Sequence, residues 1–348
     1  MGGFYTVITT IQTPTDGVLK FAERLTRYSG KLLIVGDKKG PVEYPIHLDG
    51  KNGVRFLSFQ KQLDGPFKLA RELPVGHYSR KNIGYLHAIA HGASCIYETD
   101  DDNAPLAGWQ PRKEYVEDTR VIESSNTPEK NSRWVNVYKY FVNELIWPRG
   151  LPLDEIHQAV PVTKIETGRR WSPIQQGLVN ESPDVDAIWH LVLAHTVNFE
   201  ENSSVYLEPD NWCPFNTQST WWWPAAFPLL YIPSFCSFRM CDIWRSFVAQ
   251  KCIWEMDGGI TFHPPEVVQK RNTHNLMSDF RDEIPGYDRN GDFIKILDNV
   301  NLLSGIGNTA ANLRTCYEVL VRAGFFPEDE FHLLDSWILD FEKFGKNC

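Results

Sequence analysis

Three consecutive aspartates follow directly on a short segment that is typical of a buried strand. Residues 94–98 are predicted to form the strand, and Asp100, Asp101 and Asp102 come just after it. Neighbouring carboxylates repel one another and raise one another's pKa, so this cluster favours a site where a hard divalent cation neutralises the charge. With the Asp100-x-Asp102 spacing, one or two carboxylates bind the ion and leave its remaining positions to phosphate oxygens. A polar turn with solvated acids is the alternative interpretation.

The elements before this cluster predict an α/β fold. Residues 5–10, 31–36 and 54–59 read as strands, and residues 18–28 and 78–91 read as helices. Strands that alternate with helices in this way form a mostly parallel sheet.

Polar residues follow several of the predicted strands. Thr10, Asp37 and Asp100 each come at or just past a strand end. Because ligands of parallel sheets bind at the carboxyl ends of the strands, we expect these three residues to line one crevice.

Composition limits the class of protein. The 348 residues are 42% hydrophobic and 23% charged, which fits one large globular domain. The net charge of -9 argues against nucleic acid or an anionic membrane as the main partner, because both require a basic surface. Seven cysteines without CxxC spacing favour reduced thiols. We recognise no leader and no apolar segment of about 18 residues, which predicts a soluble, cytoplasmic chain without membrane insertion.

The rest of the chain divides into three kinds of segment. Residues 110–133 read as a loop or lid, and residues 134–233 as irregular, aromatic and rich in proline. Helices are expected at about residues 241–255, 292–303, 310–323 and 328–344. We therefore expect a core over residues 1–275 and a helical C-terminal extension, residues 276–348, that packs on the core.

Short segments in a fixed order carry a resemblance to a known family. They are residues 9–14, 35–37, 79–85, 98–102, 147–153, 183–186 and 242–246. Together they resemble the STELLO family of plant Golgi glycosyltransferases, which have the GT-A fold. The likeness to the reversibly glycosylated polypeptides, which act as UDP-arabinopyranose mutases, is more distant. The resemblance implies a GT-A-like, Rossmann-type core that binds a nucleotide sugar.

The resemblance also implies an activity. A sugar would be moved from a nucleotide sugar, first of all a UDP-sugar, to a glycan or another hydroxyl acceptor, with inversion and with Mn²⁺ or Mg²⁺ as cofactor. A catalytically weak partner protein that binds sugar nucleotides and a sugar-nucleotide mutase are the alternatives. The N-terminal membrane anchor of the plant proteins has no counterpart in this sequence, so a Golgi location is expected only for an excised lumenal domain.

The residues assigned to the donor are Thr10, Asp37, Arg80, Asn82, Asp100 and Asp101. The Asp37 carboxylate suits the N–H edge of a uracil or guanine base, although a turn aspartate is the alternative. Arg80 and Asn82 open a predicted helix, where a guanidinium and free backbone N–H groups suit phosphate or sugar hydroxyls. An ordinary basic helix start is the alternative there.

The metal is assigned to Asp100 and Asp102, with His263 as a third candidate ligand. A structural histidine is the alternative interpretation of His263. Residues 269–272 are expected to close over the phosphates of a bound donor.

Asp242 is the candidate general base, because the resemblance puts it where inverting GT-A enzymes have a catalytic carboxylate. A helix N-cap is the competing interpretation of Asp242, and Asp184 and Asp186 are rival bases. The acceptor is assigned to Trp147, Arg149, Asp184, Asp186 and Trp221. Tryptophan faces pack well against sugar rings, although a place in the core is the alternative for each of them.

Overall fold

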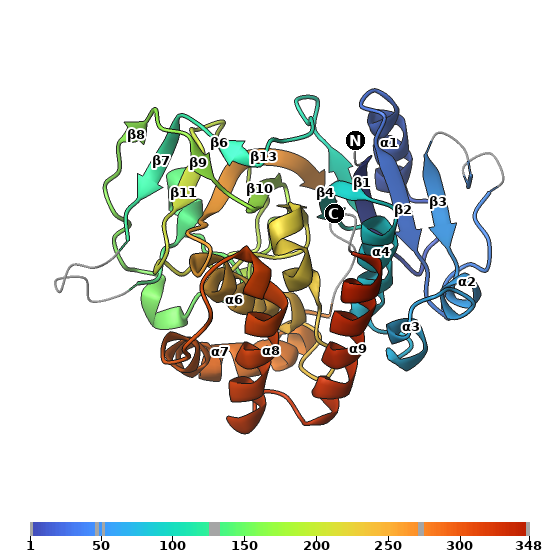
Figure 1. Cartoon of the computed structure of the whole chain (residues 1–348). Coiled ribbons are helices and arrows are strands. Elements are labelled where there is room, and N and C mark those ends of the chain that lie inside the picture. The colour runs from blue at the N-terminus through green and yellow to red at the C-terminus, as the bar shows by residue number, and fades with distance from the viewer. Residues whose placement is uncertain (1–2, 46–48, 51–52, 125–132, 271–274, 346–348) are drawn as a thin grey trace.

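The computed structural model describes the chain except residues 1–2, 46–48, 51–52, 125–132, 271–274 and 346–348. Its N-terminal part is a parallel sheet made of β1 (Gly3–Thr9), β2 (Lys31–Val35), β3 (Val54–Leu57) and β4 (Ala93–Thr99). These strands lie in the order β3-β2-β1-β4 (Figure 1). The order reverses at β1, which is the Rossmann-type arrangement that leaves a crevice between the ends of β1 and β4.

The sheet continues beyond β4 through strands that come later in the chain. The order after β4 is β12, β10, β13, β11, β7 and β8. Their bounds are Ser219–Trp222, Ile174–Asn180, Ile260–Gln269, Val205–Leu207, Thr119–Ile122 and Ile165–Glu166. Strand β5 (Asn103–Pro105) pairs with β13, and β6 (Tyr115–Val116) pairs with β9 (Arg170–Trp171) apart from the main sheet.

Two expectations were therefore wrong. Residues 134–233 are not irregular throughout, because β10 and β12 lie in the middle of the sheet. Residues 110–133 are not only a loop, since they contain β6 and β7, while residues 125–132 lie outside the described part of the chain. The predicted α/β class with a mostly parallel sheet is confirmed, because β10 and β13 run in the direction of β1 to β4 and β12 runs against them.

Helices cover both faces of the sheet (Figure 1). They are α1 (Asp16–Thr26), α2 (Phe59–Leu63), α3 (Leu69–Glu72), α4 (Lys81–Ala90), α5 (Ala187–Val192), α6 (Cys241–Trp254), α7 (Leu276–Asp298), α8 (Thr309–Arg322) and α9 (Asp329–Phe344). Successive side chains of β1 lie on opposite faces of the sheet. Ile8 packs in one apolar cluster with α1 residues such as Phe21, and Val7 packs in another with α4 residues such as Ile83.

Helix α4 lies very close to the sheet because Gly84 faces it. A Cβ at position 84 would come within 2.5 Å of Val7 Cγ1 and 2.7 Å of Val35 Cγ2. The short approach brings the N-terminal end of α4, with the 3-10 turn Tyr78–Arg80 before it, to the strand ends.

The C-terminal helices share their core with the rest of the protein. Trp244 of α6 stacks on Phe293 of α7 at 5.4 Å between ring centroids, and Trp337 of α9 is buried in the same apolar cluster as Ile83 of α4. Of the helix expected at residues 292–303, residues 292–298 are the C-terminal end of α7, which runs through Pro285, and residues 299–303 are not helical. The other predicted C-terminal helices are confirmed, whereas the division at residue 275 stays a prediction.

None of the helices in the described part of the chain combines the length and apolar character that a bilayer crossing requires. The cellular location stays a prediction.

Candidate active site

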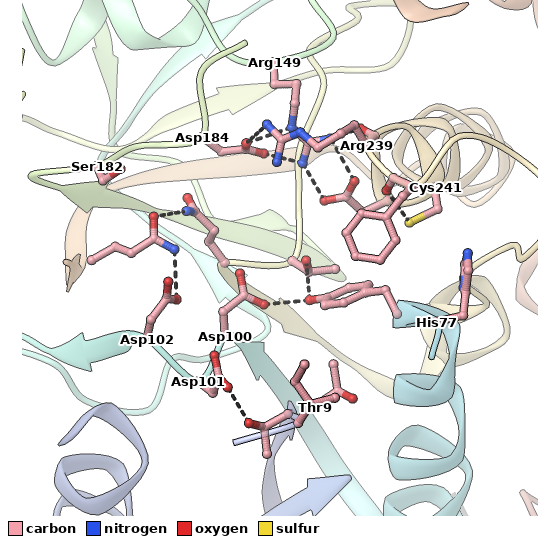
Figure 2. Close-up of a pocket in the computed structure, with 18 of the residues that line it drawn as sticks. Thr9, His77, Asp100, Asp101, Asp102, Arg149, Ser182, Asp184, Arg239 and Cys241 are labelled. Atoms are coloured by element: carbon pink, nitrogen blue, oxygen red, sulfur yellow. Dashed lines mark hydrogen bonds and ion pairs between the residues drawn. The ribbon is translucent and has the colours of Figure 1, made fainter. Parts of the chain in front are cut away.

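A cavity of about 480 Å³ opens at the edge where the parallel strands end (Figure 2). It is lined by the residues that follow β1, β2, β4 and β10, by the end of β13, by the loop before β12 and by the start of α6. Strand β12 is antiparallel to its neighbours, so its N-terminal end reaches the same edge. Segments far apart in the sequence therefore meet at one point.

The first aspartate of the cluster has two polar partners. The Tyr78 hydroxyl donates to Asp100 Oδ1 at 2.6 Å, and Lys81 Nζ lies 3.5 Å from the same oxygen. Burial and the neighbouring Asp102 raise the pKa of the Asp100 carboxyl to about 7, while Lys81 opposes the rise. A cation at this carboxylate would remove much of that unfavourable charge.

The other two aspartates point to different neighbours. The Thr10 hydroxyl donates to Asp101, and Gln269 Nε2 donates to Asp102 Oδ1 at 2.9 Å. Gln218 Nε2 in turn donates to Gln269 Oε1 at 3.0 Å. Burial raises the pKa of Asp101, which the Thr10 hydrogen bond partly opposes. The cluster is thus tied to β1 on one side and to β13 on the other.

The tip that Asp100, Asp101 and Asp102 form after β4 carries oxygen ligands that suit a hard cation. Asp100 and Asp102 offer carboxylate oxygens, the ligand type that Mg²⁺ and Mn²⁺ take up with few protein ligands and with phosphate oxygens or water in the other positions. In the described part of the chain, no group of three or more His, Cys, Asp or Glu side chains is arranged around a single ion position. Asp100 and Asp102 would therefore supply only one or two ligands to an ion and would leave its other positions to water or to ligand oxygens.

Asp37 lies in the same cavity after β2. Its Oδ2 accepts the backbone N–H of His77 at 3.1 Å, which joins the end of β2 to the turn before α4. Burial lowers the pKa of His77, and the charge of Asp37 opposes this. Thr10, Asp37 and the three aspartates, which the sequence placed at one edge, do line one cavity.

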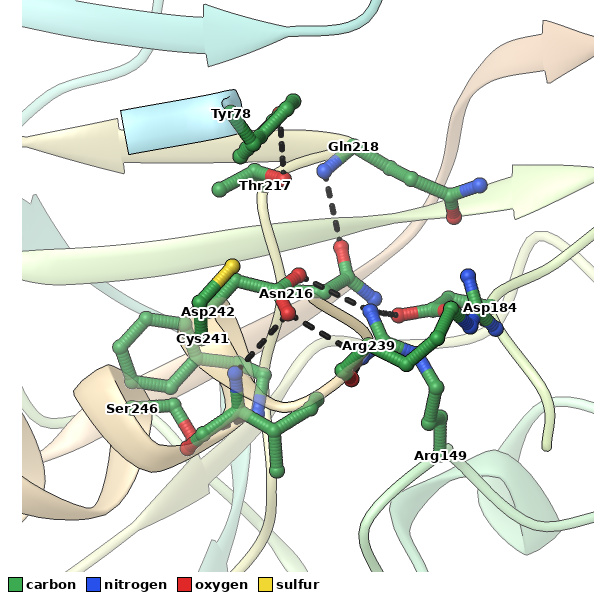
Figure 3. Close-up of polar contacts among 12 residues, drawn as sticks. Tyr78, Arg149, Asp184, Asn216, Thr217, Gln218, Arg239, Cys241, Asp242 and Ser246 are labelled. Carbon is green, nitrogen blue, oxygen red and sulfur yellow. Dashed lines mark hydrogen bonds and ion pairs between the residues drawn. The ribbon is translucent and has the colours of Figure 1, made fainter. Parts of the chain in front are cut away.

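The opposite wall contains an arginine between two carboxylates (Figures 2 and 3). Arg149 Nε and Nη2 donate to the two oxygens of Asp184 at 2.8 and 2.7 Å. Arg149 Nη1 and Nη2 donate to the two oxygens of Asp242 at 3.1 and 2.9 Å. All three side chains are buried and all three line the cavity.

The charge on Arg149 dominates the ionisation of this group. Burial alone would raise the pKa of Asp242, but the charge and the hydrogen bonds of Arg149 outweigh burial and hold that pKa below its usual value. The two carboxylates likewise raise the pKa of Arg149 against the effect of burial. Asp242 is therefore ionised at neutral pH.

Asp242 does not cap its helix. Helix α6 begins at Cys241, and Met240 occupies the N-cap position without a side-chain hydrogen bond. The Asp242 Oδ1 atom accepts the N–H of Ile243 at 3.0 Å, within the first turn. The N-cap interpretation of Asp242 was wrong.

The loop before β12 is held from two sides. Gln176 of β10 accepts the N–H of Asn216 at 3.0 Å, and Ser246 Oγ of α6 accepts the N–H of Phe215 at 3.3 Å. These contacts fix Thr217 and Gln218 at the cavity (Figure 3).

Arg80 and Asn82 are not at the cavity. Arg80 is fully buried, where its Nε donates to Gln62 Oε1 at 3.0 Å and its Nη1 to the carbonyl oxygen of Ala70 at 2.8 Å. The Asn82 side chain exchanges two hydrogen bonds, each of 2.9 Å, with the backbone of Ile232. Both side chains join backbone segments below the site, so the structure does not bring them to a donor.

His263 is also kept away from the aspartates. Its Nδ1 lies 2.7 Å from Ser204 Oγ and its Nε2 lies 2.9 Å from Gln175 Oε1. Burial lowers the pKa of His263 well below its usual value. Because both ring nitrogens are bound inside the sheet, the structural interpretation of this histidine holds.

The tryptophans assigned to the acceptor lie in the core. Trp221 is fully buried, stacks on Trp109 at 5.5 Å and donates to Glu266 at 2.8 Å. Trp147 donates from Nε1 to Asp186 Oδ2 at 2.6 Å, and Asp186 caps α5 through the N–H of Trp189. None of these side chains lines the cavity.

Several cavity residues were missed by the sequence. Tyr78, Gln218, Phe238 and Arg239 all line it. Phe238 is 52% exposed, but its exposure is visible only in the structure, because in the sequence it is one aromatic residue between Ser237 and Arg239. Of the segment expected to close over the phosphates, Gln269 lines the cavity, and residues 271 and 272 lie outside the described residues.

The sequence is similar to those of known proteins. Residues 239–347 match the family model of the STELLO glycosyltransferases. The chain is 28% identical to the probable glycosyltransferase STELLO2 of Arabidopsis thaliana, over 96% of this chain and 44% of that protein. It is 29% identical to the probable glycosyltransferase STELLO1 of the same plant, over 74% of this chain and 34% of that protein.

The expected resemblance to the STELLO glycosyltransferases is thereby confirmed. The chain spans less than half the length of these two relatives.

Proposed function

We propose that this protein is a metal-dependent glycosyltransferase that moves a sugar from a UDP-sugar to a hydroxyl group of a glycan or another acceptor, with inversion. The observation that carries the proposal is the single cavity with an acidic tip on one wall and the Asp184–Arg149–Asp242 group on the other. Such a cavity has one wall for a metal-bound diphosphate and one for the group that receives the sugar.

The donor would lie at the tip. Asp100 and Asp102 would hold Mn²⁺ or Mg²⁺, which supplies charge stabilisation for the departing diphosphate. Thr10 and Asp101 are hydrogen-bonded to each other and line the cavity, so they are in place for the hydroxyls of a ribose or sugar. Asp37, beyond them, would accept from the base.

The acceptor would lie against the opposite wall. In an inverting transfer the bond between the sugar and the diphosphate breaks as the acceptor oxygen attacks, and a carboxylate takes the acceptor proton. Asp242 is ionised and fixed in direction by Arg149, which favours it for that step. The low pKa limits its strength as a base, so the acceptor hydroxyl would have to displace part of the Arg149 contact.

The exposed ring of Phe238 supports a place for an acceptor sugar. It lines the cavity and meets the ring of Tyr78 edge-on at 6.1 Å. An exposed aromatic face of this kind suits the apolar face of a sugar ring.

A two-stage experiment tests the proposal. Nucleotide sugars are first screened by thermal shift with Mn²⁺ and with EDTA, since a ligand that binds only the folded state raises the melting temperature. The nucleotide sugars that bind are then incubated with glycan acceptors, and products are identified by mass spectrometry. We expect a UDP-sugar to stabilise the protein only with the metal and to be consumed in the presence of an acceptor.

The other outcomes of this experiment would support an alternative function or reject the proposed one. Binding without turnover would support the partner-protein alternative, and conversion of the nucleotide sugar without any acceptor would support a mutase. If no nucleotide sugar shifts the melting temperature, the proposed function is wrong.

A further inference from the structure

Helix α7, in the C-terminal part of the chain, carries a buried carboxylate that binds two segments of the site. Glu283 is 1% exposed. Its Oε1 accepts from Arg239 Nε at 2.9 Å and Nη2 at 2.8 Å. Its Oε2 accepts from the backbone N–H of Ala187 at 2.7 Å and from the Tyr287 hydroxyl at 2.6 Å. The carboxylate thus has charged and neutral donors on both oxygens.

The first segment that Glu283 binds leads directly to Arg149. Arg239 lines the cavity, and its backbone carbonyl oxygen accepts from Arg149 Nη1. The Arg239 Nη2 atom also lies 3.9 Å from Asp184 Oδ1. A shift of Arg239 would therefore change the surroundings of both members of the Arg149–Asp184 pair.

The second segment leads to Asp184. Ala187 is the first residue of α5 and comes three positions after Asp184. The backbone carbonyl oxygen of Asp184 accepts the N–H of Arg149 at 3.0 Å. Glu283 therefore binds both of the chain segments that contact Arg149. Glu283 itself does not line the cavity.

We propose that Glu283 is a positioning residue for the Asp184–Arg149–Asp242 group. Helix α7, which carries Glu283, is then needed for the geometry of the site. The effect on catalysis rests on the proposed function, whereas the effect on the position of the two segments does not.

The chain offers a matched control. Glu330 is a second buried carboxylate of the C-terminal helices, and it accepts from the backbone N–H groups of Ser234 at 3.1 Å and Phe235 at 2.7 Å. Neither of these two residues lines the cavity. Glu330→Gln therefore disturbs a comparable set of hydrogen bonds between a buried carboxylate and backbone N–H groups, but one that does not involve the Asp184–Arg149–Asp242 group.

The first arm measures position without any substrate. In Glu283→Gln one oxygen is replaced by an NH₂ group, which cannot accept from Arg239 or Ala187. Hydrogen exchange followed by mass spectrometry should show faster exchange in residues 182–187 and 237–242, by on the order of 10-fold, because local opening becomes easier. Exchange in residues 98–105 should be unchanged. Glu330→Gln should accelerate residues 231–236 instead.

The second arm measures turnover. The Mn²⁺-dependent thermal shift with UDP and the KM for the UDP-sugar should match the parent in Glu283→Gln, while kcat falls on the order of 10-fold to 10²-fold because the reacting groups are misplaced. The kcat of Glu330→Gln should stay close to that of the parent. Tyr287→Phe, which removes only one hydrogen bond to Glu283, should give a smaller change in the same direction and serves as the test if Glu283→Gln does not fold.

The outcomes separate the two proposals. If the parent binds no nucleotide sugar, the proposed function fails and the exchange arm still decides whether Glu283 positions the two segments. Unchanged exchange in Glu283→Gln, or a kcat loss equal to that of Glu330→Gln, would overturn the positioning role.

Discussion

Arg149 and Asp242, which lie 93 residues apart in the chain, face each other at the cavity with both carboxylate oxygens bound by the guanidinium at 3.1 and 2.9 Å. This paired geometry is rigid, because a planar fork of donors matches the two oxygens of a carboxylate. It keeps Asp242 ionised and aimed along one direction. The positive charge of Arg149 also makes Asp242 a weaker base, because it disfavours the protonated carboxyl group.

Asp242→Asn should separate binding from chemistry. The variant keeps the shape of the side chain, and Arg149 keeps its two hydrogen bonds to Asp184. We expect the UDP thermal shift to survive and transfer to fall by on the order of 10² to 10⁴, the range for a lost general base. Single-turnover kinetics measure the loss.

Asp184→Asn is the comparison for that experiment, because Asp184 pairs with the same guanidinium. A near-parental rate for Asp242→Asn together with a large loss for Asp184→Asn would assign the proton transfer to Asp184.

Asp102→Asn should remove the metal-dependent part of donor binding. The amide oxygen can still accept from Gln269, so the local structure should be kept. We expect the extra stabilisation by UDP in Mn²⁺ over EDTA to disappear, while the melting temperature without ligand stays or rises because a repulsive charge is gone. Asp292→Asn, on an exposed residue of α7, is the control and should retain the full metal effect. Equal metal effects in both variants would contradict a cation at the tip.

Phe238→Ala should weaken acceptor binding alone. An aromatic contact contributes about 0.5 to 1.5 kcal/mol, so the KM for the acceptor should rise by roughly 2-fold to 10-fold. Phe235 is 41% exposed on the same loop but does not line the cavity, so Phe235→Ala should leave that KM unchanged. Steady-state kinetics with one glycan acceptor compare the two variants, and a similar rise in both would exclude a specific platform.

Part of the wall proposed for the donor could be predicted, because it depends on local rules. Thr10, Asp37 and Asp100 each follow a strand with a strong β pattern, and parallel strands carry such residues to one edge. Arg80 and Asn82, which were also assigned to the donor, could not be placed in this way, because their side chains bind backbone segments away from the cavity.

The acceptor side depended on contacts that a sequence does not display. Arg149, Asp184 and Asp242 were assigned to the site and do line the cavity. Their pairing could not be predicted, because β10 and β12, which have weak strand patterns, enter the centre of the sheet and bring residues 182–184 and 217–218 to its edge. The assignment of Trp147 and Trp221 to the acceptor failed for a related reason. Trp221 belongs to a strand that is buried on both faces, so its large ring fills the core and does not meet a ligand.

Asp186 should make stability depend on pH near neutrality. Burial raises the pKa of this fully buried carboxyl to about 6, although hydrogen bonds from Trp147 and from the Trp189 backbone oppose the rise. Its pKa is higher folded than unfolded, so its contribution to stability is complete below the unfolded value of 3.8 and is lost as the pH rises through 6.

Asp186→Asn isolates this effect. The variant loses one accepted hydrogen bond at every pH, but asparagine still caps α5 and does not titrate. Between pH 5 and pH 7 the free energy of unfolding of the parent should fall by about 1 kcal/mol relative to that of the variant. Urea unfolding at both pH values measures the difference. Parallel curves for the two proteins would show that Asp186 is ionised in the folded state well below pH 5, and that the hydrogen bonds from Trp147 and Trp189 outweigh burial.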